Sequence, residues 1–170
     1  MGRPLSFFIV IVFTIFNLGA CNKARKEISV ENKPELDQAI VALKGAYAAF
    51  NRGDIDAAVQ SLDPQIEWTE PVEFTGGGAY HGCGEVKKYL TQSRAPWAEG
   101  SSEPEQFITS GNRIVVFVHA RFRPKGSTEW TDVRLADVYT IRDGKIVEMR
   151  AFAGRQEALR WVGVEDQPSR

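Results

Sequence analysis

The chain has 170 residues, of which 43% are apolar, and a formal net charge of −1. A chain of this length and composition can bury the core of one globular domain. The near-neutral charge, with no basic run that carries interleaved aromatic residues, argues against nucleic-acid binding. The only cysteines, Cys21 and Cys83, provide neither a zinc-binding spacing nor a catalytic Cys–His pattern. We therefore expect no bound metal and no cofactor.

The first twenty residues are typical of a signal sequence. A charged start at Arg3 is followed by a short apolar run over residues 5–18, and small residues then lead directly into Cys21. This arrangement resembles a bacterial lipoprotein signal peptide, in which the chain is cut before the cysteine and that cysteine is acylated. The alternative is an ordinary secretory signal that happens to precede a cysteine.

We therefore expect a signal peptide at 1–20, a lipid on Cys21 and a polar tether at 21–33. The lipid would anchor the protein to a membrane of the bacterial cell envelope. Asn22 follows the cysteine, and in a Gram-negative host this residue favours the periplasmic side of the outer membrane.

The domain at 34–164, before a tail at 165–170, begins with predicted helices. A helix over 34–51 presents an apolar stripe of Leu36, Ile40, Leu43, Tyr47 and Phe50. Gly53 ends this helix, and Asp54 is a suitable N-cap for a second one over 55–62. A third short helix is predicted over 82–93.

Five strands are predicted between and after these helices. In the first, over 66–71, Ile66, Trp68 and Glu70 share one face, which places an acid inward. Strands follow at 105–110 and at 114–123. The strand at 114–123 is apolar on both faces and so must be covered on both. The helices can cover one face, so we expect a homodimer that covers Val116 and Val118 on the other.

The last two strands, 133–142 and 145–153, form a hairpin at Asp143-Gly144. A two-residue turn would pair residue 142 with 145. A three-residue turn with Gly144 as a left-handed bulge would pair 141 with 145 and would align the apolar faces, so we prefer the second register. Asp137 then lies in an otherwise apolar row between Leu135 and Tyr139. A short helix over 155–162 completes the domain.

This order predicts an α+β fold, with a curved antiparallel or mixed sheet packed on about three N-terminal helices. The order, together with the segments YAAFNRGDIDAAV, IEWTEP and RDGKIVEMRAFAG, resembles the nuclear transport factor 2-like superfamily. Within it the chain is similar to the SnoaL-like and ketosteroid isomerase branch over residues 36–163. The resemblance implies a cone with a deep pocket for a small apolar molecule between the concave sheet face and the first helices.

The resemblance also assigns residues. In ketosteroid isomerases an aspartate before a proline is the general base, and Glu70 before Pro71 matches it. A protonated aspartate in the strand before the last hairpin donates to the dienolate oxygen, and Asp137 matches it. The tyrosine that is their second donor would fall on Ala46, whereas Tyr47 lies about 100° further round the helix.

The implied activity is cofactor-free proton transfer next to a carbonyl, with Glu70 as the base and Asp137 as the neutral donor. The other side chains that we expect to bind the substrate are Tyr47, Trp68, His119, Arg121 and Tyr139. Each of these also has a structural interpretation, as a core residue or as a partner of the buried acid. Two function classes follow: an isomerase or cyclase, and a non-catalytic lipoprotein that binds a small ligand or a partner protein.

Overall fold

The computed structural model describes residues 33–165. The predicted signal peptide, the lipidation site at Cys21 and nearly all of the tether lie outside these residues. The described chain contains the helices α1 (Lys33–Asn51), α2 (Ile55–Ala58), α3 (Gly82–Arg94) and α4 (Arg155–Trp161). Among the described helices, none combines the length and the apolar character needed to cross a bilayer.

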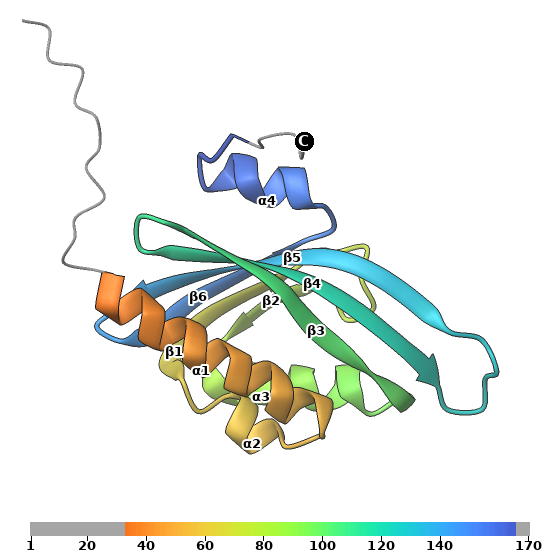
Figure 1. Cartoon of the computed structure of the whole chain (residues 1–170). Coiled ribbons are helices and arrows are strands. Elements are labelled where there is room, and N and C mark those ends of the chain that lie inside the picture. The colour runs from red at the N-terminus through yellow and green to blue at the C-terminus, as the bar shows by residue number, and fades with distance from the viewer. Residues whose placement is uncertain (1–32, 166–170) are drawn as a thin grey trace, which may run out of the picture.

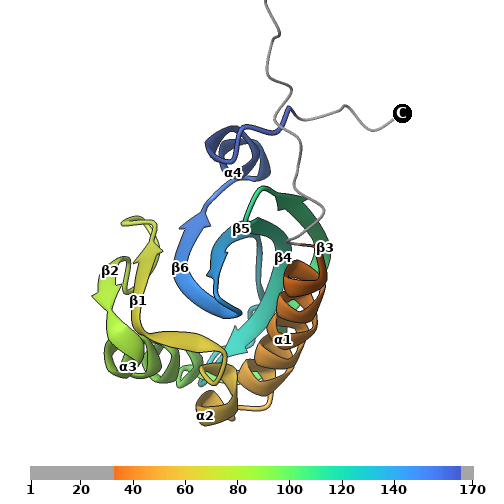
Figure 2. The same cartoon turned by 90° about the vertical axis from the view of Figure 1, so that its left-hand side faces the viewer.

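The strands form one curved, open sheet of mixed direction. Its strands are β1 (Leu62–Glu70), β2 (Gly78–His81), β3 (Trp97–Ser110), β4 (Arg113–Pro124), β5 (Thr131–Arg142) and β6 (Lys145–Phe152). They lie in the order β2-β1-β6-β5-β4-β3, and only β1 and β6 run parallel. Helices α1 to α3 lie on the concave side of the sheet, and α4 lies on the opposite side (Figures 1 and 2). The predicted α+β cone is confirmed.

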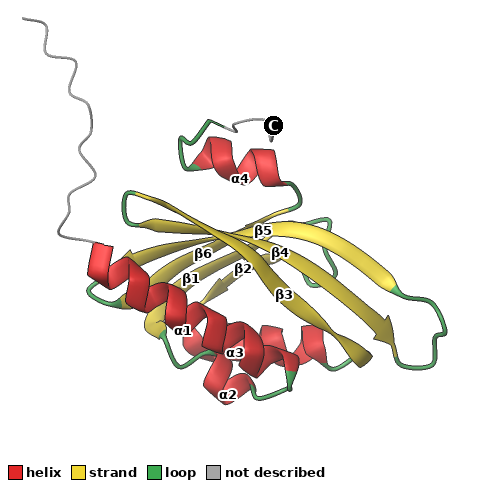
Figure 3. Ribbon diagram, viewed as in Figure 1, coloured by secondary structure: helices red, strands yellow, loops and turns green. Residues whose placement is uncertain are grey.

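Each face of the sheet has its own core. On the concave face, Leu43 of α1 and Val86 of α3 pack with sheet residues such as Ile66 and Met149. On the opposite face, a smaller cluster joins the sheet to Leu159 and other residues of α4. The sheet therefore lies between two helical layers (Figure 3).

This layering removes the argument on which the predicted homodimer rested. Val116 and Val118 lie on the concave face and are 0% and 1% exposed within a single chain. The other face of β4, with Val115 and Phe117, packs against α4. The helix at the end of the chain provides the cover that we had assigned to a second subunit.

The predicted strands are correct in order but incomplete. Residues 78–81, where no strand was predicted, form the edge strand β2, and β3 begins at Trp97 rather than at residue 105. Both are edge strands, where proline and glycine are tolerated because one side of the backbone needs no partner. The second helix is shorter than expected, since β1 already begins at Leu62.

The last hairpin has the two-residue turn, so the register that we preferred, with residue 141 paired to 145, is wrong. Asp143 and Gly144 both have positive φ, 51° and 71°, which is typical of a two-residue type I′ turn, and Arg142 pairs with Lys145. A bulge follows, because Ile141 pairs with Ile146 whereas Thr140 pairs with Glu148. The extra residue restores the alignment of the apolar faces and sets Asp137 opposite Ala151.

Candidate functional site

Two acids lie in one row across the concave face of the sheet. Trp68 and Thr69 of β1 pair with Met149 and Arg150 of β6. The next residue of β6, Ala151, pairs with Asp137 of β5. Glu70, the next residue of β1, therefore lies in line with Asp137, and only the small side chain of Ala151 separates them.

Both acids are buried, as the alternation along their strands predicts. Glu70 is 8% exposed and Asp137 is 9% exposed. Ile66 and Trp68 share the inward face of β1, whereas Glu67 is exposed. A buried carboxyl needs hydrogen-bond partners to offset its lost hydration, and each of these acids has a separate set.

The partners of Asp137 are tyrosines from α1 and from its own strand. The hydroxyl of Tyr47 donates to Oδ2 of Asp137 at 2.5 Å. That hydroxyl also lies 3.0 Å from the hydroxyl of Tyr139. Tyr47 lies on the buried face of α1 together with Leu43, one turn earlier, and this face is directed at the acid.

The partners of Glu70 are a tryptophan from its own strand and a tyrosine from α3. The indole Nε1 of Trp68 donates to Oε1 of Glu70 at 2.8 Å, and the Tyr89 side chain also stabilises this carboxylate. Trp68 in turn contacts Tyr139 edge-on, with ring centroids 6.4 Å apart. The two hydrogen-bonded sets therefore form one contiguous cluster.

Burial shifts the pKa of both acids toward neutrality. Burial, and next the negative charge of Asp137, raise the pKa of Glu70 from 4.5 to about 7, although Trp68 and Tyr89 partly oppose this rise. Burial raises the pKa of Asp137 from 3.8 to about 6, against the stabilising hydrogen bonds of Tyr47 and Tyr139. Burial also holds the pKa of both tyrosines above its usual value, so they remain donors at neutral pH.

The hydrogen bond at Asp137 differs from the predicted division of roles. Asp137 was expected to be the neutral donor, yet its carboxyl accepts a hydrogen bond from Tyr47. The physical reason is that two phenols stabilise its charged form. Because Tyr47 gives its single proton to Asp137, the phenol that can donate to a ligand oxygen in this arrangement is Tyr139.

His119 and Arg121 lie away from this cluster, which corrects their predicted place in the pocket. They alternate along β4 with Val118 and Ala120 and so point to the opposite face of the sheet. There His119 contacts Asp132 and Glu105, at 2.9 and 3.6 Å. Arg121 lies over the ring of Trp130, 4.4 Å from its centroid.

Tyr89 is the cluster residue that we did not predict. The helical stripe of α3 correctly places it inward, and that position alone is equally typical of a core residue. Its hydroxyl beside an inward acid is the signal that could have revealed it. Within residues 33–165, no group of three or more His, Cys, Asp or Glu side chains could hold a metal ion.

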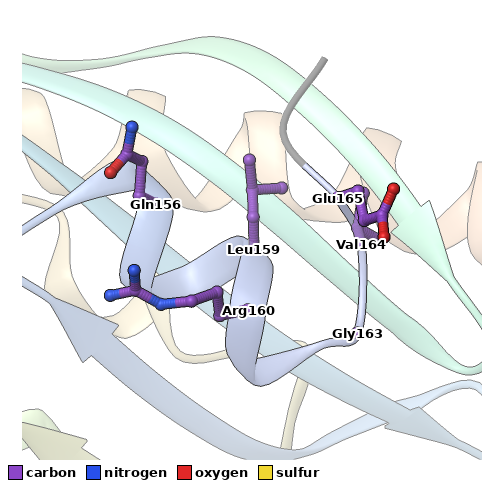
Figure 4. A pocket seen from close by; sticks show the side chains of 6 residues that line it. All are labelled: Gln156, Leu159, Arg160, Gly163, Val164 and Glu165. Atoms are coloured by element: carbon purple, nitrogen blue, oxygen red, sulfur yellow. The ribbon is translucent and has the colours of Figure 1, made fainter. Parts of the chain in front are cut away.

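Two cavities of the described residues lie away from the cluster. The larger, of about 450 Å³, is formed by α4 and the residues after it, with Leu159, Arg160 and Val164 in its wall (Figure 4). The smaller, of about 290 Å³, lies where α2, α3 and β3 meet. Neither is lined by Glu70 or Asp137.

Comparison with known proteins identifies the family. The model of the SnoaL-like domain matches residues 43–149, which include α3 and most of the cluster. The chain belongs to the SnoaL-like domain family. No curated protein matches this SnoaL-like chain.

Solved structures share its fold. A nuclear transport factor 2-like protein of unknown function from Burkholderia pseudomallei is 25% identical, with a TM-score of 0.62, and the match covers 75% of this chain and 98% of that one. TerC, co-crystallised with polyporic acid, is 24% identical, with a TM-score of 0.61 and coverage of 74% and 98%. A protein of ketosteroid isomerase-like fold from Catenulispora acidiphila, in complex with trimethylamine, is 12% identical, with a TM-score of 0.59 and coverage of 73% and 93%.

Proposed function

We propose that this SnoaL-like protein binds a small apolar carbonyl compound and catalyses a cofactor-free proton transfer next to the carbonyl, as isomerases and cyclases do. The observation that carries the proposal is the buried row of Glu70 and Asp137 with two phenols hydrogen-bonded beside it. Removing a proton from carbon needs a base whose pKa lies near the pH at which the enzyme works. It also needs neutral hydrogen-bond donors at the carbonyl oxygen, where negative charge develops.

Glu70 is the base in this proposal. Its pKa of about 7 lets it accept a proton near neutral pH and return it to a neighbouring carbon. Tyr139 donates to the enolate oxygen, while Tyr47 gives its single hydroxyl proton to Asp137 and so helps to hold both side chains in place. Trp68 orients the Glu70 carboxylate from the other side.

The test uses a β,γ-unsaturated ketone as substrate and a phenol as the mimic of the enolate. Glu70→Gln should lower turnover by about 10²- to 10⁴-fold, the usual contribution of a general base, while phenol binding persists. Tyr139→Phe should weaken phenol binding about tenfold, as expected for one lost hydrogen bond. Tyr80→Phe is the matched control, because the Tyr80 hydroxyl bonds the Gly76 carbonyl near the surface, and it should change neither quantity.

The second candidate is a binding protein without catalysis. Both cavities described above are lined by other residues, which favours it, because a cluster of satisfied hydrogen bonds can be purely structural. A wild-type protein that neither converts the ketone nor binds the phenol would overturn the enzyme proposal in favour of this one.

We propose further that the protein is lipid-anchored in the bacterial envelope through Cys21, on the periplasmic side of the outer membrane in a Gram-negative host. The motif before Cys21 supports this. Mass spectrometry of the membrane fraction should find a mature chain that begins with an acylated Cys21, and an intact Met1 would contradict it.

A homodimer stays a proposal by analogy with the family, and sedimentation of the purified chain tests it.

A further inference from the structure

The smaller cavity has a charge pattern that the proposed reaction does not use. It is lined by residues from the junction of α1 with α2, the end of α3, the start of β3 and the loop after β4: Gly53, Ile55, Thr91, Arg94, Ala95, Trp97 and Lys125. We name it the Arg94–Lys125 pocket. Its wall contains two cations and no acid.

Arg94 is held in place before any ligand arrives. Its Nη2 donates to the carbonyl of Asn51, the last residue of α1, at 3.1 Å. Its guanidinium lies 5.1 Å from the ring centroid of Trp97, and Trp97 itself stacks on Phe122 at 4.4 Å. A guanidinium fixed in this way loses little conformational entropy when it binds a second partner.

The charge of this pocket is not compensated within the described chain. Between residues 33 and 165, neither Arg94 nor Lys125 forms an ion pair, and the buried Nε of Arg94 has no hydrogen-bond partner. The nearby acids already have cationic partners: Asp54 pairs with Arg52, Asp56 with Lys87 and Glu99 with Arg123. An anion is the partner that two uncompensated cations select.

The remaining wall indicates what else the anion carries. Ile55, Ala95 and Trp97 are apolar, and a volume of about 290 Å³ lies near the lower end of small-molecule sites, roughly 300 to 1,000 Å³. We propose that the Arg94–Lys125 pocket is a binding site for a small organic carboxylate, whose two oxygens face Arg94 and Lys125 and whose apolar body contacts Ile55 and Trp97. Its residues are separate from those of the Glu70–Asp137 cluster.

Calorimetric titration of the purified chain with benzoate tests the site. Benzoate should bind saturably, the neutral analogue benzamide should not bind, and inorganic phosphate should bind more weakly because it has no apolar body. Arg94→Gln should weaken benzoate binding about ten- to a hundredfold, as expected for a charge-assisted contact. Lys125→Gln, at an exposed loop position, should weaken it about threefold to tenfold without threatening the fold.

Arg121→Gln is the matched control. Arg121 also lies over a tryptophan ring, that of Trp130 at 4.4 Å, and also lacks an ion pair among the described residues. This variant should bind benzoate as the wild type does. Absence of saturable binding up to about 10 mM benzoate overturns the proposal, since a dissociation constant of about 10 mM corresponds to a binding free energy of only a few kcal/mol. Equal losses of benzoate affinity in Arg94→Gln and Arg121→Gln also overturn it. Phosphate that binds as tightly as benzoate refutes the claim that the pocket recognises the apolar body of the ligand.

Discussion

Replacing Glu70 by glutamine should remove a pH dependence from the stability of the protein. Glutamine has the shape of the protonated acid, and its carbonyl can still accept the hydrogen bond from Trp68. The variant therefore resembles the wild type with Glu70 held neutral. At acid pH the two proteins should have nearly the same free energy of unfolding.

The sign of the difference at higher pH follows from the shifted pKa. Folding raises the pKa of Glu70 from 4.5 to about 7, so between these values the folded state binds more protons than the unfolded state. The free energy of unfolding of the wild type must then fall as the pH rises through this window. One pKa unit corresponds to about 1.4 kcal/mol, so the wild type should lose roughly 3 kcal/mol relative to Glu70→Gln.

Urea unfolding followed by tryptophan fluorescence measures this quantity. The difference in unfolding free energy between Glu70→Gln and the wild type should grow by roughly 3 kcal/mol from about pH 4 to about pH 8. Glu67→Gln, an exposed position on the same strand, is the control and should leave the difference near zero. If the Glu70→Gln difference is the same at both pH values, Glu70 does not titrate as a buried acid and the reasoning fails.

Two further predictions concern the cluster and the sheet. Tyr47→Phe removes a donor to the charged form of Asp137, so the pKa of Asp137 should rise above about 6 by roughly one unit. NMR titration of the Asp137 carboxyl carbon measures this pKa, and an unchanged value would contradict the hydrogen bond. Gly100→Ala should destabilise the domain by at least about 3 kcal/mol in thermal or urea unfolding, because φ is +129° and an added Cβ would lie 2.3 Å from the Arg121 carbonyl oxygen. Gly45→Ala is its control, since nothing lies within 4 Å of that position in α1, and it should be neutral or stabilising by up to about 1 kcal/mol.

The inward acids could be predicted because alternation along a strand is a strict geometric rule. Once Ile66 and Trp68 are assigned to the core, Glu70 must point the same way, and the row of Leu135 and Tyr139 does the same for Asp137. The rule says nothing of which face carries the helices when both faces are apolar. That is why His119 and Arg121 were assigned to the pocket and are found on the opposite face.

Other features depend on contacts that no local pattern contains. The stretch 96–104 is rich in proline, glycine and serine, and no strand was predicted there, yet residues 97–104 belong to an edge strand through pairing with β4. The reach of Tyr47 to Asp137 depends on the placement of α1 against β5, ninety residues apart in sequence.

The parallel pairing of β1 with β6 has a consequence for how the chain folds. The strands β3 to β6 follow one another as neighbouring hairpins, whose loops are short and entropically cheap to close. Trp68 of β1, by contrast, pairs with Met149, so β1 needs a strand made near the end of the chain. Pairings of such high contact order form late in folding. The row that joins Glu70 to Asp137 can therefore assemble only after β6 has been synthesised. A folding intermediate in which β1 and β6 are not yet paired does not pay the free energy of desolvating both carboxyls.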